Sequence, residues 1–260
     1  MTDTDSTAAG ELDHLAASRF QIYLAETKRP FTALAFALPL IVLYEIGAIT
    51  LLGETSADSP LIARTLIASL LSLFGVVGLH LPAVLLVAVL LAQHLMTRER
   101  WRTSPKAVLG MWLESCVWAL PFLVLGGVLG VVGFGSFEGS RIDPAAGATL
   151  ALGAGLYEEF VFRMLLMLAV HALLTDVCGV RRGPADVMAV IASAVAFAAY
   201  HGQGDSGVNA AAVFYLASGL LLGWLYLVRG FGIAAGAHTA YDLVVLALLP
   251  ALLGGVSEGS

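Results

Sequence analysis

Long apolar segments separated by short polar ones make up most of the chain after residue 30. A helix needs about 20 consecutive apolar residues to cross the hydrocarbon core of a bilayer. The pattern therefore predicts an all-α fold, a polytopic membrane helix bundle with about seven transmembrane helices. Their approximate ranges are 33–52, 61–96, 107–133, 145–170, 185–203, 208–228 and 231–249.

The segment 61–96 decides between seven and eight helices. It is too long for one upright helix, and glycine, histidine and proline residues at positions 75–82 interrupt it, so it forms one broken helix or two short ones. The loop 98–106 is the most basic in the chain, and basic loops such as this one and Lys28-Arg29 are expected on the cytoplasmic side. An even number of crossings must then separate them. This favours one crossing for 61–96 and seven helices in total, with eight left open.

Polar sequences flank the apolar part of the chain. Residues 1–30 form a polar, acidic tail, in which 14–25 fits either a short helix at the membrane interface or a frayed tail. No apolar signal-peptide region is visible there, so we expect insertion to rely on the first span. Residues 31–144 hold the N-terminal transmembrane helices, 145–249 hold the candidate chemistry, and 250–260 form a C-terminal tail.

Composition supports the membrane assignment. Hydrophobic residues make up 59% of the 260 residues and charged residues 12%, with a mean hydropathy of +0.89. A soluble domain usually carries about 25% charged residues. This composition makes the lipid bilayer the expected partner. The net charge of −6 is modest and negative, so we expect no nucleic acid. The two cysteines have no metal-site spacing.

Three charged residues stand together inside the apolar segment 145–170, namely Glu158, Glu159 and Arg163. Ionised groups at the centre of a bilayer cost at least about 2.5–3.5 kcal/mol each, and they usually mark a functional site. Glu159 and Arg163 have the i, i+4 spacing and order that suit an ion pair, which by itself is better explained by a structural link between helices. Glu158 lies about 100° further round the helix and has no local partner, which favours a functional role.

Two later apolar segments each carry a histidine. His201 ends the run 187–200, and His238 is followed by Asp242 at i+4, so these last two side chains project from one helix face. The non-functional alternative for His201 is a histidine at the membrane interface. For His238 and Asp242 it is a pair whose only role is to satisfy each other's hydrogen bonds. Depths counted at about 1.5 Å per residue place both histidines, Asp242 and Glu158 in one layer near the middle of the membrane. Such a layer of acids and bases is able to perform acid–base chemistry.

Three motifs carry a family resemblance: Glu158-Glu159-x-x-x-Arg163, Phe197-x-x-x-His201 and His238-x-x-x-Asp242. In order and membrane context they resemble the motifs of the CPBP family, the CAAX proteases and bacteriocin-processing enzymes, also called type II CAAX prenyl endopeptidases or the Abi family. The resemblance covers roughly 145–249, which it identifies as the catalytic core. The third motif has aspartate where the eukaryotic prenyl proteases have asparagine, which weakens the inference of a CAAX substrate more than that of a protease.

The resemblance implies an intramembrane endopeptidase, a multi-pass protein of a bacterial inner (plasma) membrane. Glu158 and His201 would hold and deprotonate the attacking water, and His238 and Asp242 would stabilise the oxyanion. Glu159 with Arg163 would support them. The alternative within the same reading is a catalytic zinc ion with Glu158, His201 and His238 as ligands and Asp242 or Glu159 nearby, because two histidines and a carboxylate are a common zinc set.

The rival function is a non-catalytic membrane scaffold or a proton-coupled carrier, since buried carboxylates and histidines also form proton relays. The absence of an internal repeat speaks against many carriers. The protein or peptide substrate stays open among a prenylated tail, a peptide precursor and another membrane protein. Glu45 and Glu114 are left out of the site, and we expect each to line the cavity or to pair with a basic neighbour such as Arg163.

Overall fold

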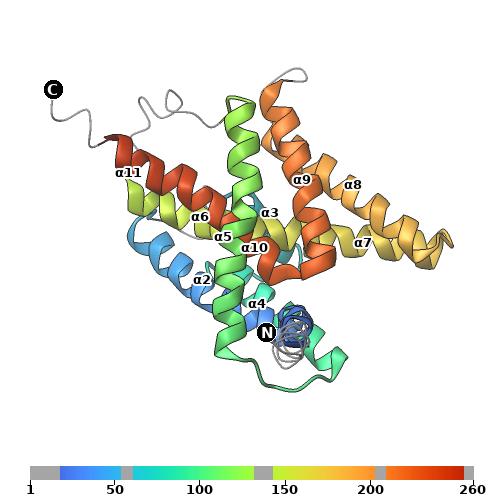
Figure 1. Ribbon diagram of the computed structural model, residues 1–260. Helices are drawn as coiled ribbons and strands as arrows, with labels where there is room; N and C mark the ends of the chain where they lie inside the picture. The colour runs from blue at the N-terminus through green and yellow to red at the C-terminus, as the bar shows by residue number, and fades with distance from the viewer. Residues whose placement is uncertain (1–17, 54–60, 132–142, 203–208, 255–260) are drawn as a thin grey trace, which may run out of the picture.

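The computed structural model describes residues 18–53, 61–131, 143–202 and 209–254, and these residues form helices and turns without any strand. Residues 18–27 are helical, which agrees with the helix rather than the frayed tail as the alternative for 14–25, and residues 14–17 lie outside the described residues. The helices that follow, drawn in Figure 1, are α2 (Pro30–Thr50), α3 (Ile62–Ser72), α4 (Leu81–Thr97), α5 (Pro105–Val128), α6 (Pro144–Glu159), the π-helical η2 (Phe160–Leu166), α7 (Met167–Ala172), the π-helical η3 (Leu173–Val177), α8 (Arg182–His201), α9 (Ala210–Arg229), α10 (Phe231–Leu243), the π-helical η4 (Val244–Leu248) and α11 (Leu249–Gly254).

Within the described residues, six helical segments are long and apolar enough to cross a membrane, and the shorter α3 and α4 accompany them. Proline begins α2, α5 and α6, where its missing N–H leaves no hydrogen bond unmade. The side chains of Asp143 and Asn209 accept hydrogen bonds from the first turns of α6 and α9. Leu113, Val117 and Val124 of α5 are exposed, as lipid-facing side chains should be. The predicted polytopic helix bundle is confirmed.

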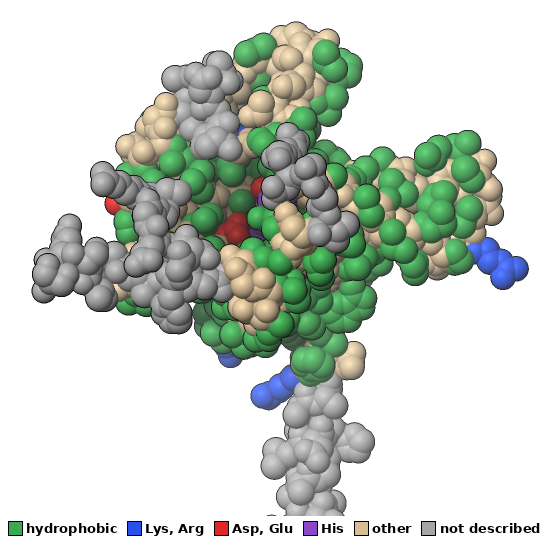
Figure 2. All heavy atoms as spheres, turned by 90° about the horizontal axis from the view of Figure 1, so that it is seen from above, with side chains coloured by type: hydrophobic (Ala, Val, Ile, Leu, Met, Phe, Trp, Pro, Cys, Tyr) green, Lys and Arg blue, Asp and Glu red, His purple; other side chains and the backbone are tan. Residues whose placement is uncertain are grey.

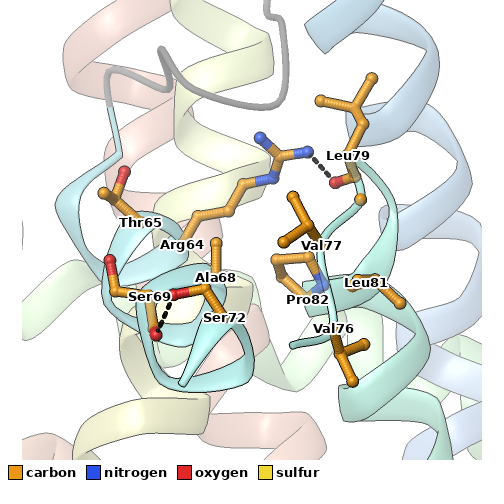
Figure 3. A pocket seen from close by; sticks show the side chains of 11 residues that line it. Arg64, Thr65, Ala68, Ser69, Ser72, Val76, Val77, Leu79, Leu81 and Pro82 are labelled. Atoms are coloured by element: carbon orange, nitrogen blue, oxygen red, sulfur yellow. Dashed lines mark hydrogen bonds between the residues drawn. The ribbon is translucent and has the colours of Figure 1, made fainter. Parts of the chain in front are cut away.

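The segment 61–96 contains the two short helices α3 and α4, of 11 and 17 residues. Gly75 lies between them with a φ of 74°, a conformation that glycine adopts without strain. The side chain of Arg64 in α3 donates a hydrogen bond to the carbonyl of Leu79 at 2.5 Å, which holds the turn against α3 (Figure 3). Of the two structures left open by the sequence, the pair of short helices is the one that forms.

Basic residues gather at one end of the bundle. Arg29, just before α2, forms a 3.4 Å ion pair with Glu99, just after α4. Arg229, the last residue of α9, donates to the carbonyl of Leu24 at 3.5 Å. These contacts bring together the basic residues before α2, after α4 and at the end of α9, as the charge pattern predicts, and we call this the basic end. Because α2 and α5 both start there, α3 and α4 together make one net crossing.

Helix α10 packs against α2, α5, α6 and α9, and most of its side chains are buried. Figure 1 shows it behind α5 at the centre of the bundle. Glycines allow this close packing: a Cβ on Gly155 of α6 would overlap Oγ1 of Thr239, and a Cβ on Gly236 of α10 would overlap Ser115 of α5. The backbone of α10, and with it His238, is therefore positioned by direct contact with its neighbours.

Candidate active site

The two adjacent glutamates end α6, and the helix continues without interruption through the π-helical η2. Oε1 of Glu159 lies 3.0 Å from Nη1 of Arg163, and both side chains are fully buried. The predicted i, i+4 ion pair is thus present. A π-helical turn adds a residue to the helix and occurs frequently at functional sites.

Two further helices enclose the cation of Arg163. Its guanidinium carbon lies 4.3 Å from the centre of the Phe197 ring of α8, within the range of a cation–π interaction. Its Nη2 also donates to the carbonyl of Gly219 in α9 at 3.5 Å. The buried charge is therefore balanced by a carboxylate, an aromatic face and a carbonyl from three different segments.

The imidazole of His238 connects this ion pair to α10. Its Nδ1 lies 2.8 Å from Oε1 of Glu159, the same oxygen that faces Arg163. Its Nε2 lies 3.4 Å from Oδ2 of Asp242. The i, i+4 spacing favours Asp242 as the residue that orients the imidazole, but the shorter contact is with Glu159, which accepts the hydrogen bond. Because a carboxylate only accepts hydrogen bonds, Nδ1 carries a proton in this arrangement.

Glu158 faces both histidines. Its Oε2 lies 3.4 Å from Nε2 of His201 and 3.9 Å from Nε2 of His238, and it makes no hydrogen bond to the described residues. Nδ1 of His201 lies 3.0 Å from the carbonyl of Phe197, so this nitrogen is the donor, and Nε2 of the neutral ring is free to accept a proton. The structure thus brings all the predicted site residues together: Glu158, Glu159, Arg163, His201, His238 and Asp242.

Two tyrosines that sequence reasoning missed also contact the site. The hydroxyl of Tyr200 donates to Oε1 of Glu158 at 3.3 Å and accepts the backbone N–H of Ala63 at 3.2 Å. The ring of Tyr215 stacks on His201 with a centroid distance of 4.3 Å. Tyr200 precedes His201 in the sequence, but neighbours on a helix diverge by about 100°, so spacing gave no sign that both reach Glu158.

A cavity of about 330 Å³ adjoins the site. Glu158, both histidines and Asp242 line one part of it, and apolar residues including Phe122 and Leu222 line the rest. Acidic and histidine side chains are visible at the bottom of a hollow in Figure 2. A second cavity, of about 220 Å³, lies around Arg64 between α3 and α4 and includes none of the predicted site residues (Figure 3).

Glu45 and Glu114 do not contact Arg163, so the partner suggested for them is wrong. Glu45 lies 2.5 Å from Nδ1 of His80 and 3.9 Å from Nη2 of Arg64. It also accepts the hydroxyl of Tyr157 at 2.8 Å. The two glutamates do have basic neighbours, as expected, but neither lines the 330 Å³ cavity.

Glu114 binds both Nε and Nη2 of Arg229, at 2.6 and 2.7 Å, and accepts the hydroxyl of Tyr23 at 2.6 Å. Burial, together with the neighbouring Glu114 carboxylate, raises the pKa of the Tyr23 phenol well above its usual value. This cluster attaches the helical residues 18–27 to α5 and α9.

Metal binding depends on how the donor groups are arranged. Across the residues that the structure describes, no set of three or more His, Cys, Asp or Glu side chains has an arrangement that would hold a metal ion. The zinc set of Glu158, His201 and His238 therefore stays a prediction from the family resemblance.

The six long apolar helices define a multi-pass integral membrane protein, and its buried acid–base site lies in a segment with known relatives. Residues 141–244 match the family described as type II CAAX prenyl endopeptidase Rce1-like, and this range contains all the predicted site residues. Through this segment the chain is similar to that protease family, in agreement with the resemblance that its three motifs carry. Comparison with curated proteins and with solved structures gave no match.

Proposed function

We propose that the protein is an intramembrane endopeptidase in which Glu158 and His201 activate a water molecule to attack a peptide bond. The observation that carries this proposal is the position of Glu158 Oε2. This carboxylate oxygen is buried and has no hydrogen-bond partner among the described residues. It faces Nε2 of both histidines and lies at the wall of a cavity.

The hydrogen bonds of His201 suit it to act as a general base. Since Nδ1 donates to the carbonyl of Phe197, Nε2 accepts a proton from a water that Glu158 also binds. The oxygen of that water then attacks the carbonyl carbon of the substrate. The proton taken from it passes to the nitrogen of the leaving amine as the peptide bond breaks.

The second histidine, His238, is suited to stabilise the negative charge that develops on the carbonyl oxygen of the substrate. With Nδ1 held by Glu159, Nε2 of His238 lies between Asp242, at 3.4 Å, and Glu158, at 3.9 Å, at the wall of the cavity. A ring that donates from both nitrogens carries a positive charge, which the carboxylates of Glu159 and Asp242 balance. A fixed donor of this kind stabilises the oxyanion of the tetrahedral intermediate.

A serine nucleophile is the main chemical rival. Ser218 of α9 lines the cavity and is buried, which its place in the sequence did not reveal. Its Oγ makes no hydrogen bond to any described residue, and so it has no base to activate it. This supports direct attack by water.

The catalytic proposal is tested with purified variants and a verified peptide substrate. We expect Glu158→Ala and His201→Ala to abolish cleavage, and His238→Ala and Asp242→Ala to reduce kcat by about 10²–10³-fold. Circular dichroism and size-exclusion profiles in detergent serve as controls for folding. Wild-type cleavage by Glu158→Ala would refute the proposal, and a scaffold or carrier would show no cleavage in any variant.

The zinc alternative is tested with the same substrate. The proposed mechanism uses only side chains and water, so we expect cleavage to persist after dialysis against a chelator. Near-stoichiometric zinc that leaves together with activity, and that Glu158→Ala and His238→Ala fail to bind, would favour the metal mechanism instead.

A further inference from the structure

The connecting segments at the two ends of the bundle differ in charge. The basic end carries Lys28, Arg29, Arg229 and the four basic residues of loop 98–106. In the sequence, the segments that connect the other ends of the helices, 51–61, 129–143 and 202–209, contain five acidic residues and a single arginine. Since basic loops are retained on the cytoplasmic side, the basic end is the cytoplasmic one.

The cavity lies on the other side of the site from the basic end. Helix α5 starts at the basic end, and the residue that it contributes to the cavity, Phe122, stands in its last third. Helix α9 runs in the opposite direction and ends at Arg229, and its contributions begin with Phe214 and Tyr215 in its first turns. Two antiparallel helices thus place their cavity residues at the same, non-basic end.

The other helices that line the cavity also place it toward the non-basic end. Helix α10 starts directly after Arg229, and the last cavity residues along its course are Val245 and Leu246, in η4. Helix α8 reaches the cavity with Phe197 and His201, which lie in its last turn. Figure 2 is seen from the end where α5 finishes and α9 begins, and the acidic and histidine side chains are visible from there.

We infer that the substrate enters this cavity from the non-cytoplasmic face of the membrane. On the proposed endopeptidase function, the substrate class is then a peptide segment already exposed on that face, such as part of an exported or membrane-anchored protein, with an apolar side chain for the Phe122–Phe214–Leu222 surface. A cytoplasmic C-terminal tail would approach the basic end instead, where no predicted site residue lies.

Cysteine labelling tests the direction of entry without any need for activity. The exposed Cys116 and Cys178, neither of which lines the cavity, are first replaced by serine. Leu150→Cys and Leu246→Cys then report on the cavity, and Arg100→Cys reports on the basic end. Right-side-out and inverted membrane vesicles are treated with a charged, membrane-impermeant maleimide.

We expect the two cavity cysteines to react in right-side-out vesicles and Arg100→Cys to react in inverted ones. Reaction of the cavity cysteines from the same side as Arg100→Cys would overturn the inference, and so would reaction only after detergent is added. Addition of Glu158→Gln to each variant should leave the labelling unchanged, because the route of entry does not depend on catalysis.

A second measurement tests the substrate class. Peptide ends are compared by mass spectrometry in cells that express the wild type or Glu158→Gln. We expect the ends specific to the wild type to map to non-cytoplasmic segments of exported or membrane proteins. Ends in cytoplasmic tails would overturn the inference, whereas no difference between the cells would refute the endopeptidase function and leave the labelling result standing.

Discussion

Nδ1 of His238 and Oε1 of Glu159 lie 2.8 Å apart, although 79 residues separate them in the sequence. The same oxygen lies 3.0 Å from Nη1 of Arg163. One buried carboxylate therefore fixes both a cation and the imidazole proposed to face the oxyanion. The supporting ion pair and the second histidine, which belong to different motifs, act as one structural unit.

Replacement of this carboxylate should affect stability and activity together. Glu159→Gln leaves Arg163 buried without its counter-charge, and we expect a loss of about 3–5 kcal/mol of unfolding free energy. Thermal unfolding in detergent measures the loss. Activity should fall as well, since the neutral amide no longer balances the positive charge proposed for the His238 ring.

Glu114→Gln is the matched control, because it removes a carboxylate from an ion pair that lies outside the cavity and is partly exposed. It should destabilise the protein less than Glu159→Gln and leave the kcat of the folded fraction unchanged. A Glu159→Gln protein that is fully stable and fully active would rule out the supporting role.

Tyr200 should act as a positioning residue for Glu158. It occupies Oε1 of the carboxylate and leaves Oε2 directed at the histidines. For Tyr200→Phe we expect kcat to fall about tenfold, in line with the loss of one hydrogen bond to a charged group, and KM to change little. In the control Tyr226→Phe, whose ring does not line the cavity, both constants should stay the same. An unchanged kcat in Tyr200→Phe would contradict this role.

Ser218→Ala separates attack by water from attack by serine. If water is the nucleophile, we expect kcat to stay within about fivefold of the wild type, because a lone buried hydroxyl contributes only about 1 kcal/mol. A loss comparable to that in Glu158→Ala would identify Ser218 as the nucleophile. The absence of a covalent acyl-enzyme in mass spectra of quenched reactions is the independent check.

The glycine contact between α6 and α10 should be sensitive to a single methyl group. A Cβ on Gly155 would overlap Thr239, so Gly155→Ala should lower the unfolding free energy by about 1–3 kcal/mol. Gly127 of α5 has open space at the same atom, and Gly127→Ala should be neutral or stabilising by up to about 1 kcal/mol. Equal melting temperatures for the two variants would show that this contact is not tight.

The sequence predicted the parts of this molecule that depend on local spacing. Apolar runs located the helices, and the i, i+4 relation located the Glu159–Arg163 pair. Contacts between helices could not be predicted from the sequence. The link from Glu159 to His238 and the place of Ser218 in the cavity depend on how α6, α9 and α10 are packed. The short helices of the 61–96 segment were ambiguous for a related reason, because their turn is held by tertiary contacts such as that of Arg64.

The π-helical stretch Phe160–Leu166 has a consequence for sequence alignment and engineering. Its wider turns correspond to one residue more than an α-helix of the same rise would need. A protein with the same site but an ordinary α-helix here would align with a one-residue gap shortly after the paired glutamates. Deletion of Leu165 would let the helix close as an α-helix and keep every later residue of the helix in its present orientation. The same deletion in a regular α-helix would rotate the later residues by about 100°.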